Sequence, residues 1–233
     1  MIFKRKIYEE LLHWKRTDEG RTAVLIQGAR RVGKSTIAEE FAAKEYETYI
    51  LVDFAACSTE IRDLFNDVSD LNRIFMRLQF EYGVELKERK SVIIFDEVQL
   101  APKARQAIKY LVKDGRYDYI ETGSLISIRK NVKDILIPSE ETKLYMYPMD
   151  YEEFRWALGD TATVKLLQGC FLNRTSLGDA TNRKLMRDFR LYMLVGGMPQ
   201  AVASYLETNN LEKVDSVKRS VITLYEEDFN KID

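Results

Sequence analysis

A glycine-rich segment near the start of the chain has the residue types and spacing of a phosphate-binding loop. It reads Gly28-Ala29-Arg30-Arg31-Val32-Gly33-Lys34-Ser35 and fits the pattern G-x-x-x-x-G-K-[ST]. A short apolar run, Thr22 to Ile26, precedes it, and a helical pattern follows it. In that order, glycines let backbone N–H groups surround a phosphate at the positive N-terminal end of a helix. A chance glycine-rich turn is the alternative, which this context disfavours.

The side chains that follow the loop extend the same chemistry. Lys34 is expected to reach the β- and γ-phosphates of a nucleotide, and the Ser35 hydroxyl is expected to ligate Mg²⁺. Thr36, the next residue of the helix, joins the predicted nucleotide-binding set. Arg30 and Arg31 lie inside the loop, where one is expected to face the nucleotide or a lid. The segment from Gly28 to Thr36 therefore predicts binding of Mg-ATP.

Two carboxylates follow a second apolar run. Val92-Ile93-Ile94-Phe95 has the length of a buried strand, and Asp96 and Glu97 come directly after it. Ligand sites of parallel sheets lie at the carboxyl ends of the strands, so Asp96 is expected to hold the Mg²⁺ shell. Glu97 is then placed to activate the water that attacks the γ-phosphate, as a general base. An acidic turn without chemistry is the alternative, and Gln99 is a weaker candidate for the same cluster.

A further strand-like run ends in Glu121-Thr122-Gly123-Ser124. If this strand lies beside the Asp96 strand, Ser124 or Thr122 comes near the γ-phosphate, as in ATPases that insert a strand between the phosphate loop and the acidic strand. Ser124 is predicted to act there, against the alternative of a plain turn. Arg129 is a candidate arginine finger and equally a candidate solvated loop arginine. Whether such a finger would act within one chain or across self-associated chains stays open.

Strand-like and helical patterns alternate through the first two thirds of the chain. Continuous apolar strands that alternate with helices indicate a parallel sheet covered on both faces. We therefore expect an α/β fold of three layers with a mostly parallel five-stranded sheet. The strand-like runs are Thr22 to Ile26, Tyr49 to Val52, Val92 to Phe95, Tyr119 to Thr122 and Lys143 to Tyr147, and helical patterns lie around 7–12, 35–42, 61–82 and 102–113.

After Pro148 the apolar periodicity becomes helical. We expect a core in residues 1–155 and a small helical lid in residues 156–233, with Gly196-Gly197-Met198-Pro199 between two of its helices. One lid helix has a basic stripe of Arg183, Lys184, Arg187 and Arg190. Such a stripe is usually a solvated helix face; the alternatives are a surface for DNA, for the γ-phosphate or for a partner domain.

Composition excludes several other classes of protein. The longest apolar runs are strand-sized, and the N-terminus has charges where a signal peptide would be apolar, so a cytosolic protein with no membrane segment is expected. Cys57 and Cys170 lie far apart and His13 is the single histidine, which disfavours a zinc site or a disulfide framework. The 36 basic and 37 acidic side chains give a net charge of -1, so nucleic-acid binding is not expected from overall charge.

Five pieces of the sequence, in order, resemble the bacterial and archaeal AAA-type ATPases that have a C-terminal domain of unknown function numbered 4143, near the STAND and archaeal ATPases. The pieces are Gly28 to Ser35, Phe95 to Gln99, Thr122 to Ser124, Tyr147 to Phe154, and Gly196 to Pro199. The resemblance implies a P-loop NTPase core of the additional-strand (ASCE) AAA type. It also implies that Gly197 and Pro199 lie near the adenine or ribose, although a plain helix connector is the alternative. Such proteins continue for a further domain, which this chain does not show.

The residues together predict an ATPase module with ATP and Mg²⁺ as cofactors, which converts ATP and water to ADP and phosphate and drives or switches a C-terminal effector domain. A slow, STAND-like nucleotide switch with little turnover, associated with DNA in one version, is the second interpretation. A small-molecule kinase is disfavoured, since Glu97 suits water activation and no pocket for a second substrate can be read from the sequence.

Overall fold

The structure is a computed structural model that describes residues 1–124 and 139–230. The chain divides into two compact units, an α/β unit of Ile7–Ala29 and Gly33–Met146, and a helical unit of Met1–Lys6, Arg30–Val32 and Tyr147–Asp233. Among the described residues, no helix combines the length and the apolar character that a membrane span requires.

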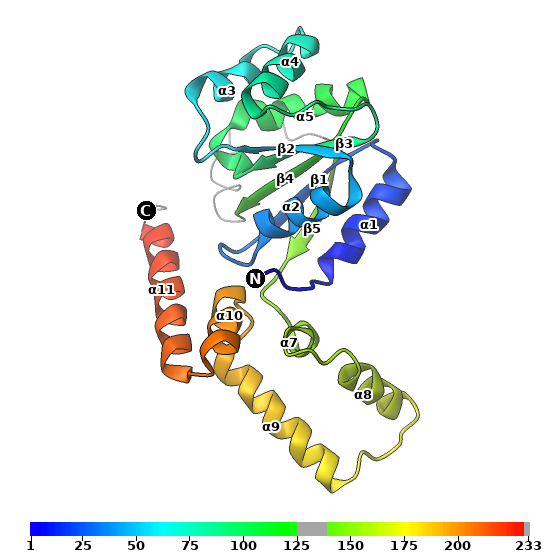
Figure 1. Ribbon diagram of the computed structural model, residues 1–233, viewed down its shortest axis with the longest axis vertical. Helices are drawn as coiled ribbons and strands as arrows, with labels where there is room; N and C mark the ends of the chain where they lie inside the picture. The colour runs from blue at the N-terminus through cyan, green and yellow to red at the C-terminus, as the bar shows by residue number, and fades with distance from the viewer. Residues whose placement is uncertain (125–138, 231–233) are drawn as a thin grey trace. The chain divides into compact units, whose positions relative to one another are not determined.

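The α/β unit contains a parallel five-stranded sheet in the order β2-β3-β4-β1-β5. Figure 1 shows α1 and α2 on one face of this sheet and α3, α4 and α5 on the other. The three-layer fold predicted from the alternating pattern is confirmed. The strands are β1 (Ala23–Gly28), β2 (Thr48–Asp53), β3 (Ser91–Asp96), β4 (Asp118–Ser124) and β5 (Glu141–Met146); the helices are α1 (Ile7–Asp18), α2 (Lys34–Glu45), α3 (Thr59–Asp63), α4 (Leu71–Tyr82) and α5 (Pro102–Asp114).

The inner strands are buried along their whole length because both faces of the sheet are covered. Every residue of β1, β3 and β4 is buried, and Phe54, Phe65 and Phe95 pack edge to face in the layer below α5. β4 lies between β1 and β3. This insertion brings the carboxyl ends of the three strands to one edge of the sheet, which is where the predicted site residues stand.

One predicted helix is divided. The pattern across 61–82 forms α3, a short 3-10 turn at Leu64–Asn66, and α4. The Asp70 side chain accepts a hydrogen bond from the Arg73 N–H and so starts α4 afresh.

The helical unit begins its first helix with a capping box, in which Asp150 and Glu153 satisfy each other's backbone N–H groups. Its apolar centre is formed by Met149, Phe154, Val195, Val202 and Val214. No strand follows Met146 among the described residues, as predicted. The helices are α7 (Tyr151–Ala157), α8 (Thr163–Leu172), α9 (Asp179–Val195), α10 (Pro199–Thr208) and α11 (Leu211–Asn230).

Candidate functional site

The loop between β1 and α2 has an unusual backbone conformation. Gly33 has a φ of 97°, in the left-handed region that favours glycine, and it immediately precedes α2. Arg31 also has a positive φ, 62°, which is strained for a residue with a Cβ. Gly33 offers no side-chain cap, and the first turn of α2 contains no acidic residue. The N-terminal end of α2 therefore keeps the positive character that attracts an anion.

Lys34 folds back over this loop. Its side chain is buried, and its Nζ donates hydrogen bonds to the carbonyl oxygens of Ala29 at 2.8 Å and Gly28 at 3.4 Å. These bonds hold the ammonium against the loop backbone. A phosphate bound by the loop would meet that charge directly.

Hydroxyl groups from two elements converge on Asp96 at the end of β3. The Ser35 Oγ, in the first turn of α2, donates to Asp96 Oδ1 at 2.6 Å. The Thr122 Oγ1, on β4, donates to the same carboxylate oxygen. Asp96 is only 8% exposed, so these bonds replace much of its hydration. The structure thus brings together Ser35 and Asp96, which were predicted as a pair from positions far apart in the chain.

The donor set of this cluster fits Mg²⁺, which prefers oxygen ligands and commonly takes only one or two protein groups, with water and phosphate oxygens completing an octahedron. Ser35 and Asp96 would supply the two protein oxygens. Within residues 1–124 and 139–230, no group of three His, Cys, Asp or Glu side chains could hold a metal ion alone.

Glu97 has a strained backbone. Its φ of 53° lies in the left-handed region, which costs a non-glycine residue on the order of 1 kcal/mol or more and is often found at functional sites. The Glu97 N–H donates to the Thr122 Oγ1 at 3.3 Å, and the Gln99 amide donates to the Glu97 carboxylate. Thr122 therefore holds both acidic residues at the end of β3, and Gln99 orients the carboxylate of the second.

The remaining predicted residues of the α/β unit are placed as follows. Ser124 is the last residue of β4, buried, and in register with Gly28. Thr36 is exposed in the first turn of α2. Arg129 lies outside the residues that the structure describes.

The loop residues Arg30, Arg31 and Val32 belong to the helical unit, and each forms a hydrogen bond with a different segment of that unit. The Tyr225 hydroxyl on α11 donates to the Arg30 carbonyl oxygen at 2.8 Å. Arg31 donates to the Gln200 side chain on α10 at 2.9 Å. The Val32 carbonyl oxygen accepts a hydrogen bond from Arg5 in the N-terminal segment at 2.8 Å.

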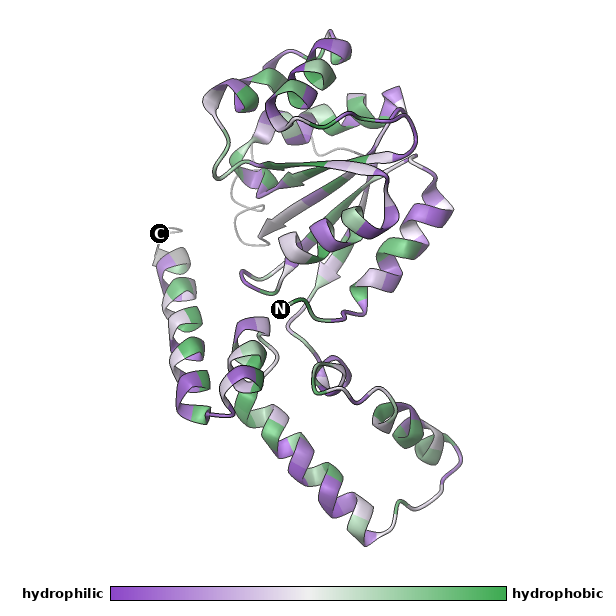
Figure 2. Ribbon diagram, viewed as in Figure 1, coloured by the Kyte–Doolittle hydropathy of each residue, from purple (hydrophilic) through white to green (hydrophobic). Residues whose placement is uncertain are grey.

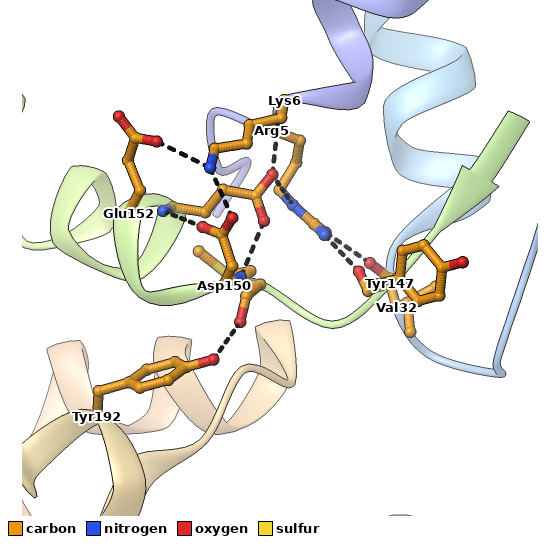
Figure 3. A network of polar contacts seen from close by, with 9 residues as sticks. Arg5, Lys6, Val32, Tyr147, Asp150, Glu152 and Tyr192 are labelled. Atoms are coloured by element: carbon orange, nitrogen blue, oxygen red, sulfur yellow. Dashed lines mark hydrogen bonds and ion pairs between the residues drawn. The ribbon is translucent and has the colours of Figure 1, made fainter. Parts of the chain in front are cut away.

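Gly197 and Pro199 have local roles in the helical unit. The Met149 N–H donates to the Gly197 carbonyl at 2.7 Å, and a Cβ on Gly197 would lie 2.1 Å from the Met149 carbonyl oxygen. Tyr192 donates to that same oxygen at 3.0 Å (Figure 3). Pro199 is the first residue of α10, where its fixed φ suits a helix start. Packing explains both residues, and their contact with adenine or ribose stays a prediction.

Comparison with protein families matches residues 20–155 to a family described as an AAA domain. That match spans more than half of the chain. The chain belongs to this AAA family. Residues 186–233 match a domain of unknown function numbered 8612, which differs from the expected domain 4143. A search of the curated proteins found no match.

Several solved structures are similar to this AAA chain. The Walker-type ATPase PABY2304 of Pyrococcus abyssi is 18% identical with a TM-score of 0.57, and the match covers 100% of this chain and 77% of that one. C. elegans PCH-2 is 11% identical with a TM-score of 0.48, over 92% of this chain and 69% of that one. The Aeropyrum pernix ORC1 protein, solved in complex with DNA, is 14% identical with a TM-score of 0.45, over 70% and 50%.

Sequence reasoning missed a buried charged cluster in the AAA core. Arg105 on α5 lies 3.1 Å from a Glu141 carboxylate oxygen and 3.9 Å from one of Glu121. Burial raises the pKa of Glu121 well above its ordinary value, and the charge of Glu141 raises it further, while Arg105 opposes both. The signal was a glutamate inside an apolar strand run, which ordinarily marks a paired or protonated group.

Proposed function

We propose that this AAA chain binds Mg-ATP and hydrolyses it to ADP and phosphate. The observation that carries the proposal is the convergence of Ser35 and Thr122 on one oxygen of Asp96. That carboxylate follows β3 at the edge of the sheet where the phosphate loop also begins. Hydroxyl and carboxylate oxygens at this position suit Mg²⁺, and a buried lysine beside a glycine-rich loop suits the phosphates that accompany it.

Each residue has a role in this proposal. Lys34 and the loop N–H groups stabilise the charge of the β- and γ-phosphates, and Ser35 and Asp96 hold Mg²⁺, which when bound neutralises phosphate charge. Glu97 accepts a proton from water as the water oxygen bonds to the γ-phosphorus. The bond from that phosphorus to the bridging oxygen breaks, and ADP leaves. Ser124 senses the γ-phosphate, and Arg129 is the proposed arginine finger.

Residues 156–233 act as the lid in this proposal, and the output passes to an effector domain. A slow nucleotide switch is the second candidate. The bonds of Arg30, Arg31 and Val32 within the helical unit favour it, because they would couple the nucleotide state of the loop to that unit. A switch should turn over far below about 1 s⁻¹, the low end for ordinary enzymes.

Calorimetry with Mg-ATP tests the binding step. Lys34→Ala should weaken affinity tenfold or more, because it removes the positive charge inside the loop. Lys44→Ala is the matched control, since Lys44 is an exposed residue of the same helix that pairs with Glu40. Equal affinity of the parent and a folded Lys34→Ala protein would remove the phosphate-loop assignment.

A further inference from the structure

Arg5 is a buried arginine that no predicted motif includes. It is 5% exposed, and all of its polar contacts lie within the helical unit. Its Nη1 donates to the Val32 carbonyl oxygen at 2.8 Å and its Nη2 to the Tyr147 carbonyl oxygen at 2.6 Å. Its Nε lies 3.2 Å from a Glu153 carboxylate oxygen. Figure 3 shows the guanidinium pointing toward Val32 and Tyr147.

The contact with Val32 fixes a donor of the phosphate loop. The peptide bond between Val32 and Gly33 is trans and planar, so its C=O and N–H point in opposite directions. A hydrogen bond that fixes the direction of the Val32 carbonyl therefore also fixes the direction of the Gly33 N–H. The positive φ of Gly33 makes this peptide one that could otherwise rotate, because glycine has access to many backbone conformations.

Glu153 connects this arrangement to the first turn of α7. Its carboxylate is buried and accepts hydrogen bonds from the Lys6 N–H at 2.7 Å and the Asp150 N–H at 3.2 Å. The Asp150 side chain in turn accepts from the Glu153 N–H at 2.9 Å. The residue that pairs with Arg5 is therefore held rigidly by the helix start.

We propose that Arg5 is a positioning residue for the nucleotide phosphates. It holds the peptide between Val32 and Gly33 in the orientation in which the Gly33 N–H donates to phosphate, and Glu153 ties that orientation to α7. This proposal rests on the proposed nucleotide binding.

The test compares Arg5→Ala with Lys6→Ala. Lys6 is the neighbouring cation and pairs with Asp150 and Glu152 of the same helix start, but its partners do not include the loop. Calorimetry with Mg-ADP should show about a tenfold loss of affinity for Arg5→Ala, the size expected for one misdirected hydrogen bond to a charged ligand, and no loss for Lys6→Ala. The amide resonance of Gly33 in nucleotide-free protein should move in Arg5→Ala but not in Lys6→Ala.

A second variant guards against misfolding. Glu153→Gln keeps the shape of the side chain and removes the charge that faces Arg5. It should weaken the affinity for Mg-ADP and move the Gly33 amide resonance in the same directions as Arg5→Ala, by smaller amounts. Parent-like affinity and an unmoved Gly33 resonance in Arg5→Ala, or a lowered melting temperature as its single effect, would overturn the proposal. A parent protein that does not bind Mg-ADP would instead overturn the nucleotide-binding function itself.

An apolar groove of about 660 Å³ between α8 and α9 is an independent feature of the helical unit. α8 contributes no buried residue, although it is mostly hydrophobic (Figure 2). Phe171 and Leu172 are 81% and 78% exposed. Large apolar side chains dominate the groove walls, among them Tyr151, Leu167, Phe171, Leu185, Met186 and Phe189.

One rim of this groove is basic. Arg183 and Arg190 are exposed and lie seven residues apart along α9. At about 100° per residue they therefore share one side of the helix, beside Met186. The nearest carboxylate on that helix, Asp188, is bonded to Arg155 at 2.7 Å and lies 3.8 Å from the Arg187 Nε, so most of its charge is neutralised within the unit.

We infer that the groove binds an acidic amphipathic helix of a partner protein. Such a helix would bury its apolar face against Leu167 and Phe189 and place its carboxylates along the two rim arginines, Arg183 and Arg190. The apolar walls disfavour nucleic acid, because phosphates would lose hydration there without gaining a polar contact.

A fluorescent designed helix of leucine and glutamate is the probe. It should bind the parent with a Kd on the order of 10 µM or tighter, and the same helix with lysine in place of glutamate should not. Reversal of the rim by Arg183→Glu and Arg190→Glu together should abolish binding. Lys184→Glu, on the same helix but facing away from the groove, should leave binding nearly intact.

Three results would overturn this inference: no binding of the acidic helix, equal binding by the rim-reversed protein, or tighter binding of single-stranded DNA at the same residues. Concentration-dependent dimerisation that the rim reversal abolishes would assign the groove to a second copy of this chain instead. Light scattering coupled to size-exclusion chromatography measures that outcome.

Discussion

Gly197 provides a sharp test of how the helical unit is packed. Replacement by alanine adds one methyl group at a position where the Cβ would lie 2.1 Å from the Met149 carbonyl oxygen. Non-bonded heavy atoms attract each other best at about 3.5 Å or more. The obstacle is backbone of a residue that is 1% exposed, so it cannot swing aside as a flexible side chain would.

The cost can be worked from these contacts. Separating the two backbones would weaken the 2.7 Å hydrogen bond from the Met149 N–H to the Gly197 carbonyl, a loss of about 1 kcal/mol. Overpacking of a filled site adds about 1–3 kcal/mol. The free energy of unfolding should therefore fall by about 2–4 kcal/mol, which corresponds to about 5–15 °C in melting temperature for a chain of this size.

Thermal unfolding followed by circular dichroism measures this loss. Gly169→Ala is the matched control, because Gly169 lies in α8 with nothing within 4 Å of an added Cβ, and alanine there should leave stability equal or slightly higher. A Gly197→Ala protein as stable as the parent would refute the packing argument. If that stable protein bound ATP weakly, the predicted contact of Gly197 with the nucleotide would be favoured instead.

Two further predictions concern the α/β unit. Thr122→Val should raise the Mg²⁺ concentration needed for half-maximal ATP hydrolysis and cost about 1.5–3 kcal/mol of stability, because Asp96 loses a buried hydrogen bond; a metal titration with an unchanged midpoint would contradict it. Glu121→Gln should stabilise the protein increasingly from about pH 4.5 upward, because the raised pKa of Glu121 means that stability is lost as the pH rises from the unfolded value of 4.5 toward the folded one. Melting temperatures across that range check this, and a constant difference from the parent would contradict it.

The fold was predictable because its signals are local. The apolar runs coincide with β1 to β5 to within about two residues. β4 lies beside the acidic strand β3, and the Thr122 hydroxyl at its end contacts Asp96. The break between α3 and α4 was not foreseen. Apolar periodicity continues across it, whereas Ser58 and Asp70 cap each helix separately.

The site was only partly predictable, because several of its contacts join residues far apart in sequence. Ser35 and Asp96 belong to motifs and were expected to meet, whereas Arg5 reaches Val32 and Glu153 from a segment with no motif. Periodicity describes one element at a time and is silent on such contacts.

The clash behind Gly197 is equally hidden from the sequence. A glycine in a turn ordinarily indicates a special φ, but the φ of Gly197 lies outside the left-handed region. The absence of a side chain matters there because the Met149 backbone is close. The family resemblance placed this turn near the nucleotide, and that contact stays a prediction.

Single-turnover hydrolysis of Mg-ATP by the parent and by Glu97→Gln tests the central claim most directly. The substitution keeps the shape of the side chain and its contact with Gln99 but removes the base. Binding of Mg-ATP should persist while the rate of ADP formation falls about 10²–10⁴-fold. A Glu97→Gln protein as fast as the parent would contradict the assignment of the base, and a parent that forms no ADP from bound ATP would contradict the hydrolase itself.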